Sequence, residues 1–140
     1  QLKSDNEIIK DEKVEIEEKV QSDVYQISAE IPEFDPEVIS SLREMVGQEM
    51  LLSVFEDFEK EAEEQIANSI AAFKNNDVVT IQKELHTLKG NSGTIGLMRI
   101  HEVTKDIEVP AKAGNLEGFS ERADLLMYEF EQFKLKYKNI

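Results

Sequence analysis

The sequence predicts an all-α protein, an antiparallel up-down-up-down four-helix bundle with a short extra helix at its N-terminal side. Two observations predict this class. Only three Pro and six Gly interrupt the 140 residues, too few for the tight turns of an all-β domain. Apolar residues also recur every three or four positions over four successive stretches with short connections. This spacing gives each helix one apolar face for a shared core.

The short extra helix is expected over residues 36–46. Asp35 can cap its N-terminus, Pro36 suits its first turn, and Gly47 follows its end. Residues 1–33 are rich in charge and sparse in apolar residues. We therefore expect a disordered charged linker there, with a loosely attached helix as the alternative. The bundle domain is predicted over residues 34–140.

The four long helices follow in order, each with a signal at its start or end. The run Asn75–Asp77 ends the first of them and caps the second. Pro110 is expected to kink the end of the third, and the turn Gly114–Asn115 leads to the fourth. The predicted ranges are about 51–73, 78–95, 100–111 and 119–137.

Composition excludes several classes of function. The net charge of −14 disfavours nucleic acid as a partner, because a phosphate backbone attracts a basic surface. No apolar run approaches the ~20 residues that cross a membrane, so no membrane contact is expected. The absence of Cys removes disulfides, thiolate metal sites and cysteine nucleophiles. No signal peptide is visible, so we expect a cytoplasmic protein, and the initial Gln suggests a piece of a longer one.

One segment of the second long helix departs from good helix-forming sequence. Residues 86–96 include Gly90 and Gly93, and an interior glycine costs about 1 kcal/mol relative to Ala. At helical spacing both glycines share a face with His86, beside the core stripe and outside it. We therefore expect His86 to project outward, over a patch cleared for the backbone of another protein.

The chemistry that suits this face is phosphoryl transfer through the imidazole. Lys83 and Lys89 bracket His86 and form a small positive island in an acidic protein. A neutral histidine, with a reference pKa of about 6.5, has a nucleophilic nitrogen at neutral pH and can form covalent intermediates. An ammonium such as Lys89 can neutralise phosphoryl oxygens. Such transfer depends mainly on positioning and charge.

The motif in this segment is His86-Thr87-Leu88-Lys89-Gly90-Asn91-Ser92-Gly93-Thr94-Ile95-Gly96. It closely resembles the signature of histidine-containing phosphotransfer (HPt) domains, and the likeness continues to Ile100 and to Ile107-Glu108. The resemblance covers about residues 34–140. It implies a bundle that accepts a phosphoryl group from the aspartate of one response-regulator receiver domain and passes it to another.

The resemblance also implies roles for single residues. His86 matches the phosphorylated histidine, Lys89 its charge partner, and Gly90 a position that leaves room for docking. We expect Gly93 and Lys83 to belong to the same docking surface, with a solubilising surface charge as the alternative role of Lys83. Pro110, in contrast, is not part of the family pattern.

Glu108 matches an acid that, in chemotaxis-kinase phosphotransfer domains, holds the far nitrogen of the histidine ring. Other members have Gln or another polar residue there. The spacing supports a meeting, because residues 86 and 108 lie at similar distances from a turn near Gly96. A carboxylate there can hold the Nδ1 proton of His86 and leave Nε2 free to attack.

The predicted protein is a phosphoryl carrier and not an autonomous enzyme. No P-loop or kinase glycine-rich loop is present, so no ATP site is expected. We expect no cofactor in this chain, because Mg²⁺ would belong to the partner receiver domain. The expected state is a monomer. The C-terminal module of a hybrid sensor histidine kinase is the favoured context, with a free-standing phosphotransfer protein or the front of a chemotaxis-type kinase left open.

A helical bundle could also serve one of two other functions. A passive helical interaction module without phosphotransfer is the alternative. A di-metal carboxylate bundle is excluded, because neither His86 nor His101 has a Glu three residues before it. His101 is interpreted as structural or solvated. The acidic run from Glu56 to Glu64 is interpreted as the solvated face of a helix, with partner selection as its alternative role.

Overall fold

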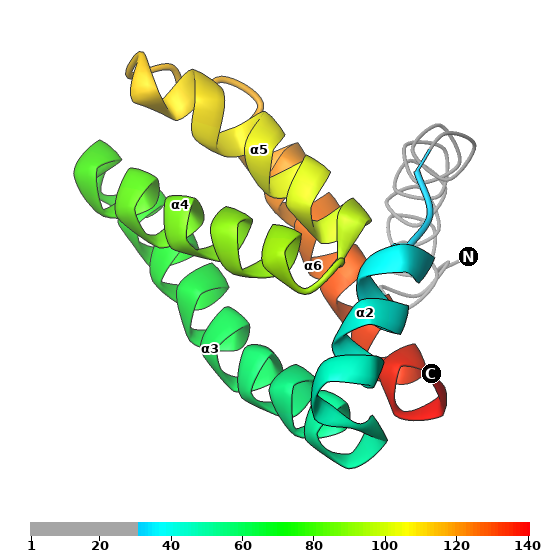
Figure 1. The fold of residues 1–140 in the computed structure, drawn as a ribbon. Coiled ribbons are helices and arrows are strands. Elements are labelled where there is room, and N and C mark those ends of the chain that lie inside the picture. The colour runs from blue at the N-terminus through cyan, green and yellow to red at the C-terminus, as the bar shows by residue number, and fades with distance from the viewer. Residues whose placement is uncertain (1–30) are drawn as a thin grey trace, which may run out of the picture.

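A computed structural model describes residues 31–140, and within them the protein is all-α (Figure 1). The predicted disorder of residues 1–30 lies outside the described residues. The elements are α2 (Pro36–Val46), α3 (Gln48–Lys74), α4 (Val78–Thr94), α5 (Met98–Lys112), α6 (Phe119–Lys136) and the 3₁₀ turn η1 (Tyr137–Asn139).

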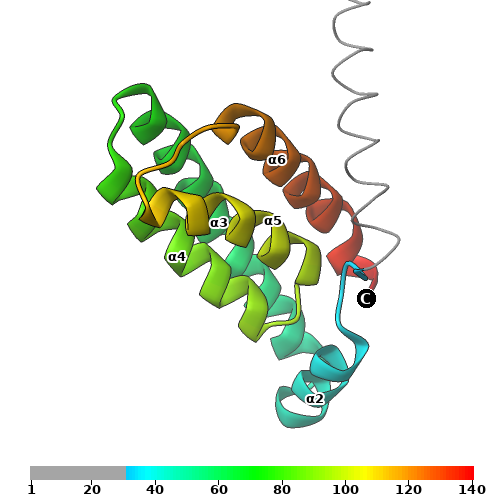
Figure 2. The same cartoon turned by 90° about the horizontal axis from the view of Figure 1, so that it is seen from above.

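The four long helices form the predicted antiparallel bundle. Each of α3, α4, α5 and α6 packs against its successor, and α6 returns to α3 (Figures 1 and 2). The short helix α2 lies where α3 begins, near the C-terminal end of the chain. There the Gln48 side-chain amide donates to the carbonyl of Ile140 at 2.9 Å. The fold class predicted from the sequence is confirmed.

Aromatic rings from α3 and α6 fill the core at this end of the bundle. The Phe133 ring packs edge-on against Phe55 and Phe58, with centroids 5.9 and 5.4 Å apart, and it stacks on Tyr137 at 4.7 Å. All four side chains are buried. The large buried area of such rings holds α3 against α6 at this end of the bundle.

Side-chain caps fix the starts of α2 and α4 as predicted. Asp35 Oδ1 accepts hydrogen bonds from the backbone N–H groups of Glu37 and Val38 at 3.0 and 3.4 Å. Asp77 accepts one from the backbone N–H of Thr80 at 3.1 Å and one from its hydroxyl at 2.6 Å. These bonds lower the pKa of Asp77. The third long helix continues past Pro110 to Lys112.

The segment before α2 is attached to the connection between α4 and α5. Phe34 forms an antiparallel bridge with Leu97, and the N–H of Asp35 donates to the carbonyl of Gly96 at 2.8 Å. The backbone carbonyl of Glu33, a residue predicted to belong to the linker, accepts a hydrogen bond from the backbone N–H of Met98 at 3.2 Å. None of the helices within residues 31–140 is long and apolar enough to cross a membrane.

Candidate functional site

His86 lies on the solvent side of α4. The buried residues of this helix are Ile81, Leu85, Leu88 and Ser92, and His86 falls outside that stripe. Its side chain is 68 % exposed. The outward projection predicted from the helical spacing is therefore present, and the ring is accessible to a partner.

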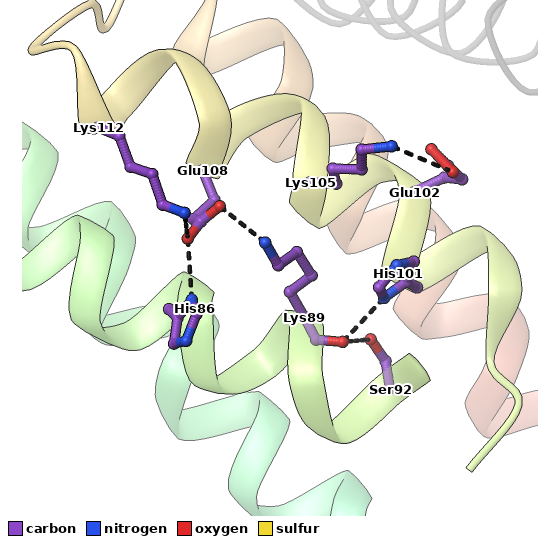
Figure 3. Close-up of polar contacts among 8 residues, drawn as sticks. All are labelled: His86, Lys89, Ser92, His101, Glu102, Lys105, Glu108 and Lys112. Atoms are coloured by element: carbon purple, nitrogen blue, oxygen red, sulfur yellow. Dashed lines mark hydrogen bonds and ion pairs between the residues drawn. The ribbon is translucent and has the colours of Figure 1, made fainter. Parts of the chain in front are cut away.

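One edge of the exposed ring is held by a residue of α5. His86 Nδ1 lies 3.0 Å from Glu108 Oε1 (Figure 3). Ile107 belongs to the buried stripe of α5, so helical spacing alone would place the neighbouring Glu108 at the edge of the interface between the two helices. Its side chain is instead fully buried, with 0 % exposure, beneath the side chains that it contacts. The predicted meeting of His86 and Glu108 thus occurs, with the carboxylate deeper than expected.

Glu108 has three cationic or N–H partners. Besides His86, the ammonium of Lys89 lies 3.0 Å from Oε2, and the ammonium of Lys112 lies 3.3 Å from Oε1. Lys89 comes from the same helix as His86, and Lys112 comes from the helix of Glu108 itself. Figure 3 shows all three side chains pointing at the carboxylate.

The charge state of Glu108 decides which nitrogen of the His86 ring carries the proton. Burial acts to raise the pKa of Glu108, but the bonds from Lys89, His86 and Lys112 outweigh it, so the pKa is lowered. The carboxylate is therefore ionised near neutral pH and can only accept hydrogen bonds. His86 Nδ1 must be the donor, which leaves Nε2 of a neutral ring with its lone pair. That nitrogen is a nucleophile.

The structure separates the two glycines of the motif. A methyl group at Gly90 would meet no atom within 4 Å, so the surface above it is open. A methyl group at Gly93 would lie 2.9 Å from His101 Nδ1. The absence of a side chain at Gly93 therefore lets the His101 ring of α5 pack against α4. This packing role was not predicted from the sequence. The docking role of Gly93 stays a prediction, as do those of Gly90 and the exposed Lys83.

His101 is structural, as one of its two predicted interpretations stated. Its Nδ1 lies 2.9 Å from the backbone carbonyl of Lys89, and the Ser92 hydroxyl donates to the same oxygen at 3.0 Å. A carbonyl only accepts, so His101 Nδ1 donates. This bond joins α5 to α4 at the residue whose side chain reaches Glu108.

Lys112 is a further member of the site that is not among the residues predicted from the sequence. Its spacing from Glu108 is the favourable i, i+4 order of acid before base, so a helix-pair search could have found it. No sequence signal pairs Gly93 with His101. Across residues 31–140, no group of three or more His, Asp or Glu side chains could hold a metal ion.

A four-helix bundle that presents one exposed imidazole, with Nδ1 fixed and Nε2 free, is the architecture of a phosphoryl carrier. The Hpt domain family matches residues 53–136, more than half of the chain, and the protein belongs to this family. It is therefore a phosphorelay carrier of two-component signal transduction, a class that exchanges phosphoryl groups with receiver domains.

Two solved structures share the fold. The histidine-containing phosphotransfer protein HptB from Pseudomonas aeruginosa PAO1 superposes with a TM-score of 0.71 at 24 % identity, over 76 % of this chain and 92 % of its own. A putative histidine-containing phosphotransfer protein from rice gives a TM-score of 0.67 at 14 % identity, over 88 % of this chain and 90 % of its own. No curated protein sequence matches the chain.

Proposed function

We propose that Nε2 of His86 accepts a phosphoryl group from the aspartate of one receiver domain and passes it to the aspartate of another. The observation that carries this proposal is the bond of 3.0 Å between His86 Nδ1 and Glu108 Oε1, on a side chain that is 68 % exposed. It combines a free lone pair with access for a partner.

The transfer step follows from this tautomer. The lone pair of Nε2 forms the N–P bond, the P–O bond of the aspartyl phosphate breaks, and its electron pair returns to the aspartate oxygen. The Nδ1 proton stays in place, so the phosphorylated ring carries a positive charge. Glu108 faces that charge at hydrogen-bond distance and stabilises it. Release to the second receiver is the same step in reverse.

Lys89 is the charge partner in this proposal. Its ammonium lies one helical turn from His86 and contacts Glu108 Oε2 at 3.0 Å. With a side chain that is 21 % exposed, it is placed to lower the energy of a phosphoryl dianion on the neighbouring ring. Gly90 and Lys83 would then contact the receiver, since Gly90 leaves open space one turn from His86 and Lys83 is exposed one turn before it.

The receiver supplies the rest of the chemistry. In this proposal Mg²⁺ is bound by the receiver and acts on the phosphoryl oxygens, while this chain contributes the acceptor and its charge environment. The chain acts as a monomer in the cytoplasm, as predicted from the sequence. A passive interaction module, the alternative in the sequence analysis, would bind receivers without taking up a phosphoryl group, and the experiment below distinguishes the two.

The test is transfer from a phosphorylated receiver domain, followed by mapping of the label. The wild-type protein should become labelled at His86 alone, with the acid-labile and alkali-stable behaviour of phosphohistidine. The variant His86→Gln should keep its helical circular dichroism and take up no label, because its amide has no nucleophilic ring nitrogen. Undiminished labelling of that variant would end the proposal. A wild-type protein that binds receivers without labelling would identify the passive module.

A further inference from the structure

Lys112 lies at the C-terminal end of α5 and contacts one particular oxygen of Glu108. Its ammonium lies 3.3 Å from Glu108 Oε1, the oxygen that also accepts the hydrogen bond from His86 Nδ1 at 3.0 Å. Lys89 contacts the other oxygen. Lys112 therefore shares an acceptor atom with the ring, and Figure 3 shows both groups at the same end of the carboxylate.

The formal charges around Glu108 show what this contact does. At rest, with a neutral His86, the carboxylate and the two ammonium groups of Lys89 and Lys112 carry one net positive charge. A phosphoryl dianion and the positive ring that holds it add one net negative charge. The phosphorylated cluster is then neutral. Without Lys112 it would carry one net negative charge beside the phosphoryl group.

The same carboxylate has two opposite effects on phosphorylation. Glu108 fixes the ring and stabilises its positive charge, but its own negative charge repels the phosphoryl oxygens. A cation on Oε1 cancels that repulsion and leaves the hydrogen bond to Nδ1 intact. Lys112 is 52 % exposed, so this effect is partly screened by solvent and salt.

We propose that Lys112 is a positioning residue for phosphotransfer, which compensates the charge of Glu108 so that the carboxylate orients His86 without repelling the phosphoryl group. This inference rests on the proposed function of His86. It assigns to Lys112 an action through Glu108 and no contact of its own with the phosphoryl oxygens.

A double-mutant cycle with a small phosphoryl donor tests this action. Phosphoramidate transfers its phosphoryl group to an imidazole nitrogen and releases ammonia, so no receiver is needed. The rate of phosphohistidine formation, followed by ³¹P NMR, is compared in the wild type, Lys112→Gln, Glu108→Gln and the double variant. We expect Lys112→Gln to slow the reaction about threefold when Glu108 is present, an effect of the size expected for a partly exposed ion pair. When Glu108 is replaced by Gln, we expect the same substitution to slow the reaction by less than about 1.5-fold.

Lys105 provides the matched control. It lies on the same helix, is 51 % exposed, and pairs with Glu102 at 4.0 Å instead of Glu108. Lys105→Gln removes the same charge from the protein, and it should leave the rate unchanged. In addition, the ¹⁵N shifts of His86 should report the same Nδ1–H tautomer in Lys112→Gln as in the wild type, because Glu108 still holds that proton.

The outcomes separate this inference from the proposal on which it rests. Wild-type protein that gains no phosphohistidine at His86 from either phosphoramidate or a phosphorylated receiver domain would overturn the proposed function. If only the receiver labels His86, the same four proteins are compared with the receiver as donor. Normal wild-type labelling with an equal loss in both backgrounds would show that Lys112 acts without Glu108, and it would overturn the inference alone. So would an equal effect of Lys105→Gln, since bulk charge would then explain the result.

Discussion

Glu108 on α5 and Glu129 on α6 are both fully buried carboxylates, yet their charge states are driven in opposite directions. Glu108 receives donors from three side chains, and its pKa is lowered despite burial. Glu129 forms an ion pair with Arg99, and burial, together with the charge of Glu33, raises its pKa more than Arg99 and Lys136 lower it. The balance between burial and donors therefore differs: the bonds from three side chains outweigh burial at Glu108, and burial outweighs the guanidinium at Glu129.

The two carboxylates also differ in the geometry of their contacts and in how far their partners reach solvent. Arg99 Nη2 donates to Glu129 Oε2 at 3.2 Å, whereas Arg99 Nε lies 3.0 Å from Oε1 without hydrogen-bond alignment. The Arg99 side chain is only 12 % exposed. The Glu108 cluster, in contrast, reaches solvent through His86 and Lys112. One site is therefore open to a reaction partner, and the other joins α5 to α6.

The largest effect should come from removing the cation of the closed site. Arg99→Met leaves Glu129 buried without its partner, and we expect it to lower the free energy of unfolding by about 3 kcal/mol. Lys112→Met should lower it by less than about 1 kcal/mol, because Lys112 is half exposed and Glu108 keeps two partners. Urea denaturation of both variants measures the difference. Equal losses would remove the distinction between the two sites.

The second prediction concerns the helix spacing on which the Glu108 cluster depends. Gly90→Ala should raise the free energy of unfolding by about 1 kcal/mol, because it improves helix propensity in open space. Gly93→Ala should instead lower it by about 1 kcal/mol, because its methyl group displaces the His101 ring. Thermal or urea denaturation of the pair tests this opposite sign. Stabilisation by both substitutions would show that His101 does not fix the spacing.

The smallest effect should appear in the pH dependence of stability. The ordinary glutamate pKa is 4.5. Above that value and up to its raised pKa, Glu129 binds more proton in the folded state, so stability falls as pH rises. Below 4.5 and down to its lowered pKa, Glu108 binds less proton in the folded state, so stability is lost as pH falls.

Neutral variants should reveal these two slopes. Relative to the wild type, Glu129→Gln should gain stability as pH rises above 4.5, and Glu108→Gln should lose stability as pH rises toward 4.5. Urea denaturation at pH values on both sides of 4.5 gives both curves. Parallel curves for the two variants would show that the carboxylates titrate alike.

The sequence predicted those features that depend on one helix or on one register. Asp35 and Asp77 cap helices because a short polar side chain reaches its own backbone. Likewise, counting outward from the turn near Gly96 was enough to bring His86 and Glu108 together. Both arguments need only the helical repeat and the position of a connection.

Contacts that depend on how two helices face each other were beyond the sequence. The approach of His101 to Gly93, and the pairing of Arg99 with Glu129 across 30 positions, require the rotation and separation of neighbouring helices. The full burial of Glu108 has the same origin, because only the packed structure shows that Lys89 and Lys112 cover it.

The bond from Glu108 also bears on the conformational entropy of His86. An exposed side chain ordinarily exchanges among rotamers, and ordering one at an interface opposes binding by about 0.5–1.5 kcal/mol. The His86 ring is ordered in advance by its contact with α5, at 68 % exposure, so an arriving receiver does not have to restrict it. The same ordered ring serves uptake and release equally.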